Sequence, residues 1–147
     1  MGLLPVLGSY LVQTGSYSLN ALISSVPSGI LVFNLLFLNE FPDLEADKMA
    51  GRKNLVILLG RRRAAWIYSF LTVFVYLWII LASLYGSIPS SSLISLLTIP
   101  AGLKAIRLSI ENYDDIEKLI PALGANVVVV LLTQLLLGIG YLIGTFL

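Results

Sequence analysis

The sequence of 147 residues contains no cysteine and no histidine. The absence of cysteine excludes disulfides and thiolate metal sites. The absence of histidine excludes imidazole metal ligands, histidine-ligated haem and any catalytic triad with a histidine base. Charged residues are also scarce, at 12%, against roughly a quarter in an ordinary soluble protein. The net charge of +1 gives no electrostatic reason to expect a nucleic acid partner, so we expect none.

What the sequence has in excess is apolar residues, which make up 58% of it. The nine basic and eight acidic residues all fall in two segments, one from Glu40 to Arg63 and the other from Lys104 to Lys118. The remaining charge-free blocks hold 39, 40 and 29 residues. A helix needs about 20 apolar residues to cross a bilayer core. The sequence therefore predicts an all-α, polytopic transmembrane helix bundle that forms a single domain over residues 1–147.

The charge-free blocks predict four full spans and one partial span. The partial span is Gly2–Val12, which as a helix is only about 16 Å long at 1.5 Å per residue. We therefore expect it to be the outer end of a helix whose beginning is missing, and the chain to be the C-terminal part of something larger. The four full spans are expected at Leu19–Leu38, Ala64–Tyr85, Ser91–Ile106 and Ala122–Phe146.

The two charged segments form the loops 39–63 and 104–118, which one hairpin separates, so both loops lie on the same side of the membrane. All nine lysines and arginines lie in them. The positive-inside rule then predicts that both loops are cytoplasmic. The expected location is the cell membrane, with several passes.

Three oxygen-bearing side chains in the first loop are spaced by four residues: Asn39, Asp43 and Asp47. In a helix they share one face, and Arg52 and Lys53 follow just beyond. Carboxylate and amide oxygens suit Mg²⁺, which shares phosphate oxygens with its substrates, and the cations can bind the same phosphates. Pro42 either starts a new helical segment or kinks the preceding span. Because charged loop residues are often only solvated, the spacing alone leaves both interpretations open.

The same segment resembles the second aspartate-rich motif of the UbiA superfamily of intramembrane prenyltransferases. The closest resemblance is to the 1,4-dihydroxy-2-naphthoate prenyltransferases of menaquinone biosynthesis, whose pattern is approximately N-N-x-x-D-x-x-x-D-x-x-x-G-K-x-T-L. The matching residues are Asn39, Asp43, Asp47, Gly51 and Leu55. Two positions depart from the pattern: Arg52 stands in place of the usual lysine, with Lys53 beside it, and Asn54 replaces threonine.

The resemblance implies half of a nine-helix fold and an isoprenoid transferase that moves a polyprenyl group from a polyprenyl diphosphate to an aromatic acceptor. It implies that Asp43 and Asp47 are catalytic and hold Mg²⁺, and that Asn39, Arg52 and Lys53 bind the diphosphate. Family members also carry a first motif, N-D-x-x-D-x-x-x-D, which this sequence lacks. We therefore expect a partner N-terminal half that supplies it.

Other functions remain open at this stage. The chain can be a degenerate or regulatory member of the same ancestry that binds lipid or a partner subunit without catalysis. A CDP-alcohol phosphatidyltransferase also uses spaced aspartates with Mg²⁺, but its D-G-x-x-A-R opening is missing here. A small transporter fits the hydropathy, although Asp43 and Asp47 lie at the membrane surface rather than within a span.

Several residues outside the motif are expected to shape the bundle. The pair Gly140 and Gly144, spaced by four, permits close helix packing. Asn34 and Asn126 are polar residues within spans, and we expect them to form hydrogen bonds between helices. The run that begins at Arg61 is expected to anchor the topology of the span that follows it.

Overall fold

The computed structural model describes residues 2–146 and contains only helical elements over that range, which confirms the all-α prediction. Four helices are long and apolar enough to cross a membrane, counting the continuous segment Ser90–Glu111 as one. A fifth, α1, is short. The elements are α1 (Leu3–Thr14), α2 (Leu19–Met49), α3 (Leu55–Leu59), α4 (Arg61–Leu84), the 3₁₀ helix η1 (Ser90–Thr98), α5 (Ile99–Glu111) and α6 (Ile116–Gly144).

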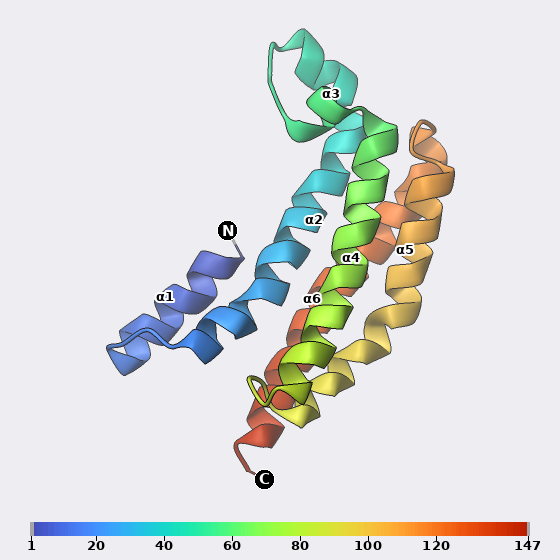
Figure 1. The fold of residues 1–147 in the computed structure, drawn as a ribbon. Helices are drawn as coiled ribbons and strands as arrows, with labels where there is room; N and C mark the ends of the chain where they lie inside the picture. The colour runs from blue at the N-terminus through green and yellow to red at the C-terminus, as the bar shows by residue number, and fades with distance from the viewer. Residues whose placement is uncertain (1, 147) are drawn as a thin grey trace.

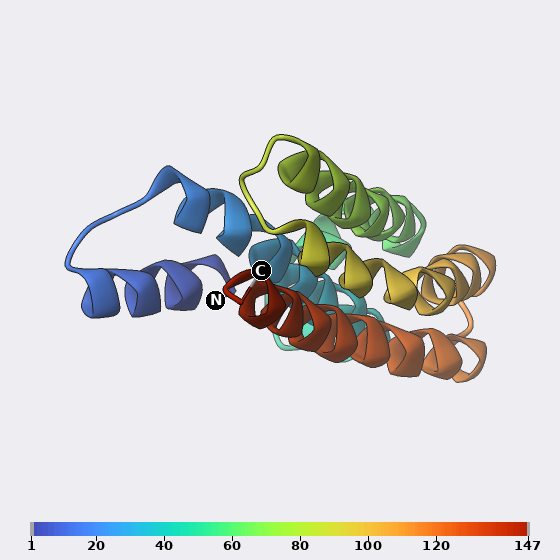
Figure 2. The same cartoon turned by 90° about the horizontal axis from the view of Figure 1, so that it is seen from below.

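The helices α2, α4, α5 and α6 lie side by side in a bundle, while α1 leaves it at an angle (Figures 1 and 2). Among the described elements, α1 contacts only α2. The short helix α3 and the loop between α5 and α6 lie at one end of the bundle (Figure 1). Both charged segments therefore meet at this end, here called the charged end, as the predicted topology requires.

All four long helical segments extend further into the charged segments than the predicted spans, and α2 and α6 extend furthest. Helix α2 continues past Leu38 to Met49 and contains both Pro27 and Pro42. Helix α6 begins at Ile116, capped by the side chain of Asp115, which accepts a hydrogen bond from the backbone N–H of Lys118. Most of the residues expected to form a loop after Leu38 are thus helical.

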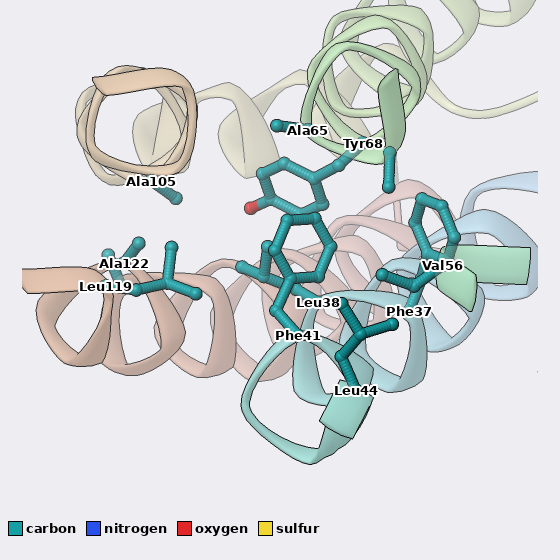
Figure 3. Packing of buried hydrophobic residues seen from close by; sticks show 12 residues of the cluster. Phe37, Leu38, Phe41, Leu44, Val56, Ala65, Tyr68, Ala105, Leu119 and Ala122 are labelled. Carbon is teal, nitrogen blue, oxygen red and sulfur yellow. The ribbon is translucent and has the colours of Figure 1, made fainter. Parts of the chain in front are cut away.

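The core at the charged end is a cluster of apolar side chains from α2, α3, α4, α5 and α6 (Figure 3). Large residues of α2, such as Phe41, fill its centre, and alanines on the neighbouring helices allow close approach. A second cluster occupies the other half of the bundle. Because α2 contributes to both clusters, its rotation about its own axis is fixed along its length.

Polar side chains connect the helices between these clusters. The Asn34 side-chain amide donates to the hydroxyl of Thr72 over 3.0 Å, and the Tyr68 hydroxyl donates to the side-chain oxygen of Asn126 over 3.1 Å. Asn34 and Asn126 are each only 1% exposed. The predicted hydrogen bonds between spans are therefore present.

The half of the third span that lies away from the charged end is a nine-residue 3₁₀ helix, η1, rather than the α-helix expected there. A 3₁₀ helix has three residues per turn, so Ser92, Ser95 and Thr98 share one face, and all three are buried. This face packs against α6, where a Cβ on Gly140 would collide with the backbone of Ser92. The predicted close packing at the glycine pair thus occurs within the chain.

Candidate functional site

The end of α2 carries the three spaced oxygen-bearing residues on one helical face. Because the helix continues through Pro42, Asn39, Asp43 and Asp47 follow one another at intervals of about one turn. Asn39 and Asp43 are exposed, and Asp47 is partly buried. The opposite face of the same turns holds Phe41 and Leu44 in the core. Core packing therefore turns the polar face of α2 outward.

A glycine turn folds the chain back after α2. Gly51 has a φ of +70°, in the left-handed region, which glycine adopts without steric cost. The backbone N–H of Gly51 donates to the carbonyl of Lys48 over 3.1 Å, and that of Arg52 donates to the carbonyl of Asp47 over 2.9 Å. This pair of bonds is a Schellman motif, the common glycine-dependent helix ending. The motif reverses the direction of the chain, so Arg52 lies beside Asp47.

The carboxylate of Asp47 is held on both of its oxygens. Arg52 Nη1 lies 3.0 Å from Oδ1, and the side-chain amide of Asn54 donates to Oδ2 over 3.0 Å. The Asp47 side chain is 13% exposed, whereas that of Arg52 is 72% exposed. The carboxylate is thus fixed in the interior of the turn, and the guanidinium covers it from the solvent side.

Asn54 also begins the next helix. Its side-chain oxygen accepts a hydrogen bond of 2.8 Å from the backbone N–H of Ile57, which makes Asn54 the N-cap of α3. The following Val56 is fully buried in the charged-end core. Asn54 was not among the sequence-predicted site residues. Asparagine directly before an apolar stretch indicates an N-cap, but its bond to Asp47 depends on the intervening turn.

Two further charged residues, Lys53 and Glu40, lie in or next to the end of α2. Lys53 is exposed and forms no ion pair within residues 2–146. Glu40, adjacent to Asn39, has a buried carboxyl oxygen, Oε2, that lacks a hydrogen-bond partner in the same range. Sequence reasoning did not single out Glu40. It lies seven residues before Asp47, about two helical turns, so it extends the polar face of α2.

Arg61 joins the two charged segments. Its Nε donates to the backbone carbonyl of Phe41 in α2 over 3.1 Å, and its Nη1 lies 3.8 Å from the carboxylate of Asp114. The Arg61 side chain is only 14% exposed. The residue expected to anchor the topology therefore also connects α4 to the motif-bearing helix and to the loop before α6.

Asp115 in that second loop is paired locally. The Lys118 ammonium lies 2.8 Å from its carboxylate and, together with the Lys118 backbone N–H, lowers the pKa of Asp115. Asp115 is thus engaged in starting α6 rather than facing the motif.

The donor set on α2 fits part of a Mg²⁺ site. Mg²⁺ in phosphate-binding sites commonly takes one or two carboxylates and completes its six positions with water and substrate oxygens. Asp43 and Asp47 can supply the carboxylates and Asn39 an amide oxygen. Within residues 2–146, no group of three or more His, Cys, Asp or Glu side chains surrounds a potential metal position.

A family model described as the UbiA prenyltransferase family matches residues 1–127. The chain is 29% identical over 112 residues to a 1,4-dihydroxy-2-naphthoate octaprenyltransferase of Bacillus subtilis, a match covering 76% of the chain and 36% of that protein. It is 28% identical over 117 residues to a 2-carboxy-1,4-naphthoquinone phytyltransferase of Synechocystis, covering 80% and 38% respectively.

A mouse protein, UbiA prenyltransferase domain-containing protein 1, is 34% identical over 99 residues, covering 67% of the chain and 29% of that protein. The matches to these three curated relatives span between 29% and 38% of their length. No solved structure matches the chain significantly.

Proposed function

The chain belongs to the UbiA prenyltransferase family, and we propose that it supplies the second aspartate motif of a membrane prenyltransferase. The proposed reaction transfers a polyprenyl group from a polyprenyl diphosphate to an aromatic acceptor such as 1,4-dihydroxy-2-naphthoate. The observation that carries the proposal is the polar face of α2, where Asn39, Asp43 and Asp47 are aligned and the cation Arg52 contacts Asp47. The named activities of the two bacterial relatives support the choice of a naphthalene-type acceptor.

Each of the five site residues has a proposed role. Asp43 and Asp47 hold Mg²⁺, and Asn39 orients the bound diphosphate or contributes its oxygen to the metal. Arg52 and Lys53 bind diphosphate oxygens. A bound Mg²⁺ supplies positive charge that offsets the charge developing on the departing diphosphate. Because Arg52 is exposed and already beside Asp47, it can contact phosphate oxygens without a large movement of the backbone.

In the proposed reaction the allylic C–O bond to diphosphate breaks, a ring carbon of the acceptor forms the new C–C bond, and that carbon releases its proton. The side chains on α2 and in the following turn contact the leaving diphosphate rather than the acceptor. Their contribution is electrostatic stabilisation and orientation. No histidine base is required, which is compatible with the composition of the chain.

The site is proposed to be completed by an N-terminal half that carries the first aspartate motif. Two carboxylates from one helix leave most Mg²⁺ positions to other donors, and the match to the relatives spans about a third of their length. Both charged segments, 39–63 and 104–118, are proposed to face the cytoplasm, because all nine lysines and arginines lie there.

The test is a prenyl-transfer assay in detergent or lipid, with the chain alone and with the chain joined to an N-terminal half that carries the first motif. The joined protein is expected to transfer the prenyl group in the presence of Mg²⁺, and the chain alone is expected to be inactive. If the joined protein folds but has no activity, the alternative of a non-catalytic family member that binds lipid or a partner subunit replaces this proposal.

A further inference from the structure

We propose that Asn54 is a positioning residue for Asp47, and that its side-chain amide ties the orientation of this carboxylate to the formation of α3. The inference deepens the proposed function, because Asp47 is a proposed Mg²⁺ ligand there. It rests on two hydrogen bonds made by the two ends of one amide, to Asp47 Oδ2 over 3.0 Å and from the N–H of Ile57 over 2.8 Å.

The two partners leave the amide a single orientation. The backbone N–H of Ile57 requires an acceptor, so it selects the side-chain oxygen of Asn54. The carboxylate of Asp47 requires a donor, so it selects the NH₂ group. Rotating the amide by 180° would place donor against donor and acceptor against acceptor. The cap of α3 therefore aims the NH₂ group at Asp47.

Asn54 is attached to α3, which is packed into the core. Val56, two residues after Asn54, is fully buried in the core with Phe37 and Phe41. These two residues belong to α2, the helix that also carries Asp47. The amide thus bridges two elements that are packed against each other, and it keeps the carboxylate in one rotamer.

Arg52 and Asn54, the two hydrogen-bond partners of Asp47, differ in how easily a bound diphosphate can displace them. Arg52 is a cation with a 72% exposed side chain, so an arriving diphosphate can recruit it away from Oδ1. Asn54 is partly buried and neutral, so it stays on Oδ2 and leaves the negative charge of the carboxylate intact. Oδ1 is then available to the metal. Hydrogen bonds to ligating carboxylates are a general feature of metal sites, and losing one typically costs 10–100-fold in metal affinity.

The experiment compares three substitutions in the joined protein that shows prenyl transfer. Asn54→Asp keeps the cap, because aspartate caps helices as well as asparagine, but it loses the donor to Asp47 and adds a second negative charge. Asn54→Ala loses both bonds. Asn54→Thr keeps a hydroxyl that accepts and donates, and serves as the conservative rescue.

The readouts are the Kd of Mn²⁺ in the presence of inorganic diphosphate, measured by electron paramagnetic resonance, and the melting temperature without metal. We expect Asn54→Asp to raise the Kd by about 10–100-fold and to lower the melting temperature, because two carboxylates then face each other without a donor between them. Asn54→Thr should stay within about threefold of the parent Kd, and Asn54→Ala should lower the melting temperature as well as the affinity.

An unchanged or tighter Mn²⁺ Kd in Asn54→Asp overturns the inference, because a cap alone would tolerate this substitution. The same titration on Asp47→Asn and Asp43→Asn separates this result from failure of the proposed function. If these two variants lose Mn²⁺ and Asn54→Asp does not, only the positioning role is wrong. If they bind Mn²⁺ normally, the metal assignment itself fails.

Discussion

The side-chain amide of Asn126 in α6 donates a hydrogen bond of 3.2 Å to the backbone carbonyl oxygen of Asn34 in α2. Asn126 also accepts the hydroxyl of Tyr68 in α4, so one side chain joins three spans. Asn34 lies five residues before Asn39, which in an α-helix is about 140° further round the axis. A bond that holds residue 34 inward therefore helps to hold the motif face outward.

Asn126→Leu is expected to lower the free energy of unfolding by about 1–2 kcal/mol, because it leaves the buried Tyr68 hydroxyl without its acceptor. The measurement is thermal unfolding in a single detergent. Asn20→Leu, at an exposed position of the same bundle, is the control and should change stability by less than about 0.5 kcal/mol. If both variants lose the same free energy of unfolding, the buried hydrogen bond does not stabilise the bundle more than an exposed side chain does.

Asp43→Asn and Asp47→Asn are each expected to lower turnover in the joined protein by about 10²–10³-fold while leaving it folded. Each removes a charge needed most as the diphosphate leaves. The control is Asp114→Asn, a 77% exposed carboxylate of the neighbouring loop, which should retain most activity. Turnover is measured at several Mg²⁺ concentrations, and excess Mg²⁺ should partly restore Asp47→Asn if affinity alone is lost. Full activity in both motif variants would remove the metal assignment.

Gly51→Ala is expected to destabilise the protein by about 1–2 kcal/mol, since a Cβ is strained at the left-handed φ of +70°. Gly15→Ala is the matched control, because Gly15 also has a left-handed φ, +71°, and both positions are open to a Cβ. Both variants should lose similar stability. Only Gly51→Ala should weaken diphosphate binding, measured by competition with a labelled prenyl diphosphate, because only that turn places Arg52 and Asp47. Equal binding by the two variants would contradict this reasoning.

Gly140→Ala is expected to cost about 1–3 kcal/mol by overpacking, because its Cβ meets the backbone of Ser92, which cannot rotate away. Gly138→Ala, two residues earlier in α6, meets nothing within 4 Å. It should be neutral or slightly stabilising, since alanine favours a helix over glycine by up to about 1 kcal/mol. Unfolding curves of the two variants give the comparison, and a neutral Gly140→Ala would contradict the close contact.

Single cysteines introduced as Ser87→Cys and Asn112→Cys are expected to react from opposite sides of the membrane with an impermeant maleimide. The chain has no native cysteine to interfere, and the two positions lie at opposite ends of the span Ser90–Glu111. Asn112→Cys should be protected from outside in intact cells and labelled after permeabilisation. Labelling of both from the same side would overturn the topology.

The sequence predicts the architecture well because the strongest signal, long charge-free blocks, reports burial in lipid. The sequence does not decide the local structure at Pro42, where a new helical segment and a kink in the preceding span are both physically allowed. The structure has one helix from Leu19 to Met49, so Pro42 does not start a new one. Proline removes one backbone hydrogen bond, but Phe41 and Leu44 on either side of it are buried in the core, and this packing holds the helix together.

The site is predictable only in part, for a similar reason. The spacing of Asn39, Asp43 and Asp47 is local and follows from the helix itself. The bond between Asn54 and Asp47 joins residues seven apart and requires the turn at Gly51 to close in one way. A spacing rule for helices does not describe such a turn. Whether Asp43 and Asp47 bind a metal remains a prediction.

The 3₁₀ geometry of η1 also sets how far the third span reaches. Nine residues extend about 18 Å as a 3₁₀ helix and about 13.5 Å as an α-helix. The segment Ser90–Glu111 is the shortest of the four candidate spans, with 22 residues. The 3₁₀ geometry of the nine residues of η1 lengthens this span by about 4–5 Å without adding a residue. The span thereby gains length against the thickness of the bilayer, where each ångström of hydrophobic mismatch costs a fraction of a kcal/mol.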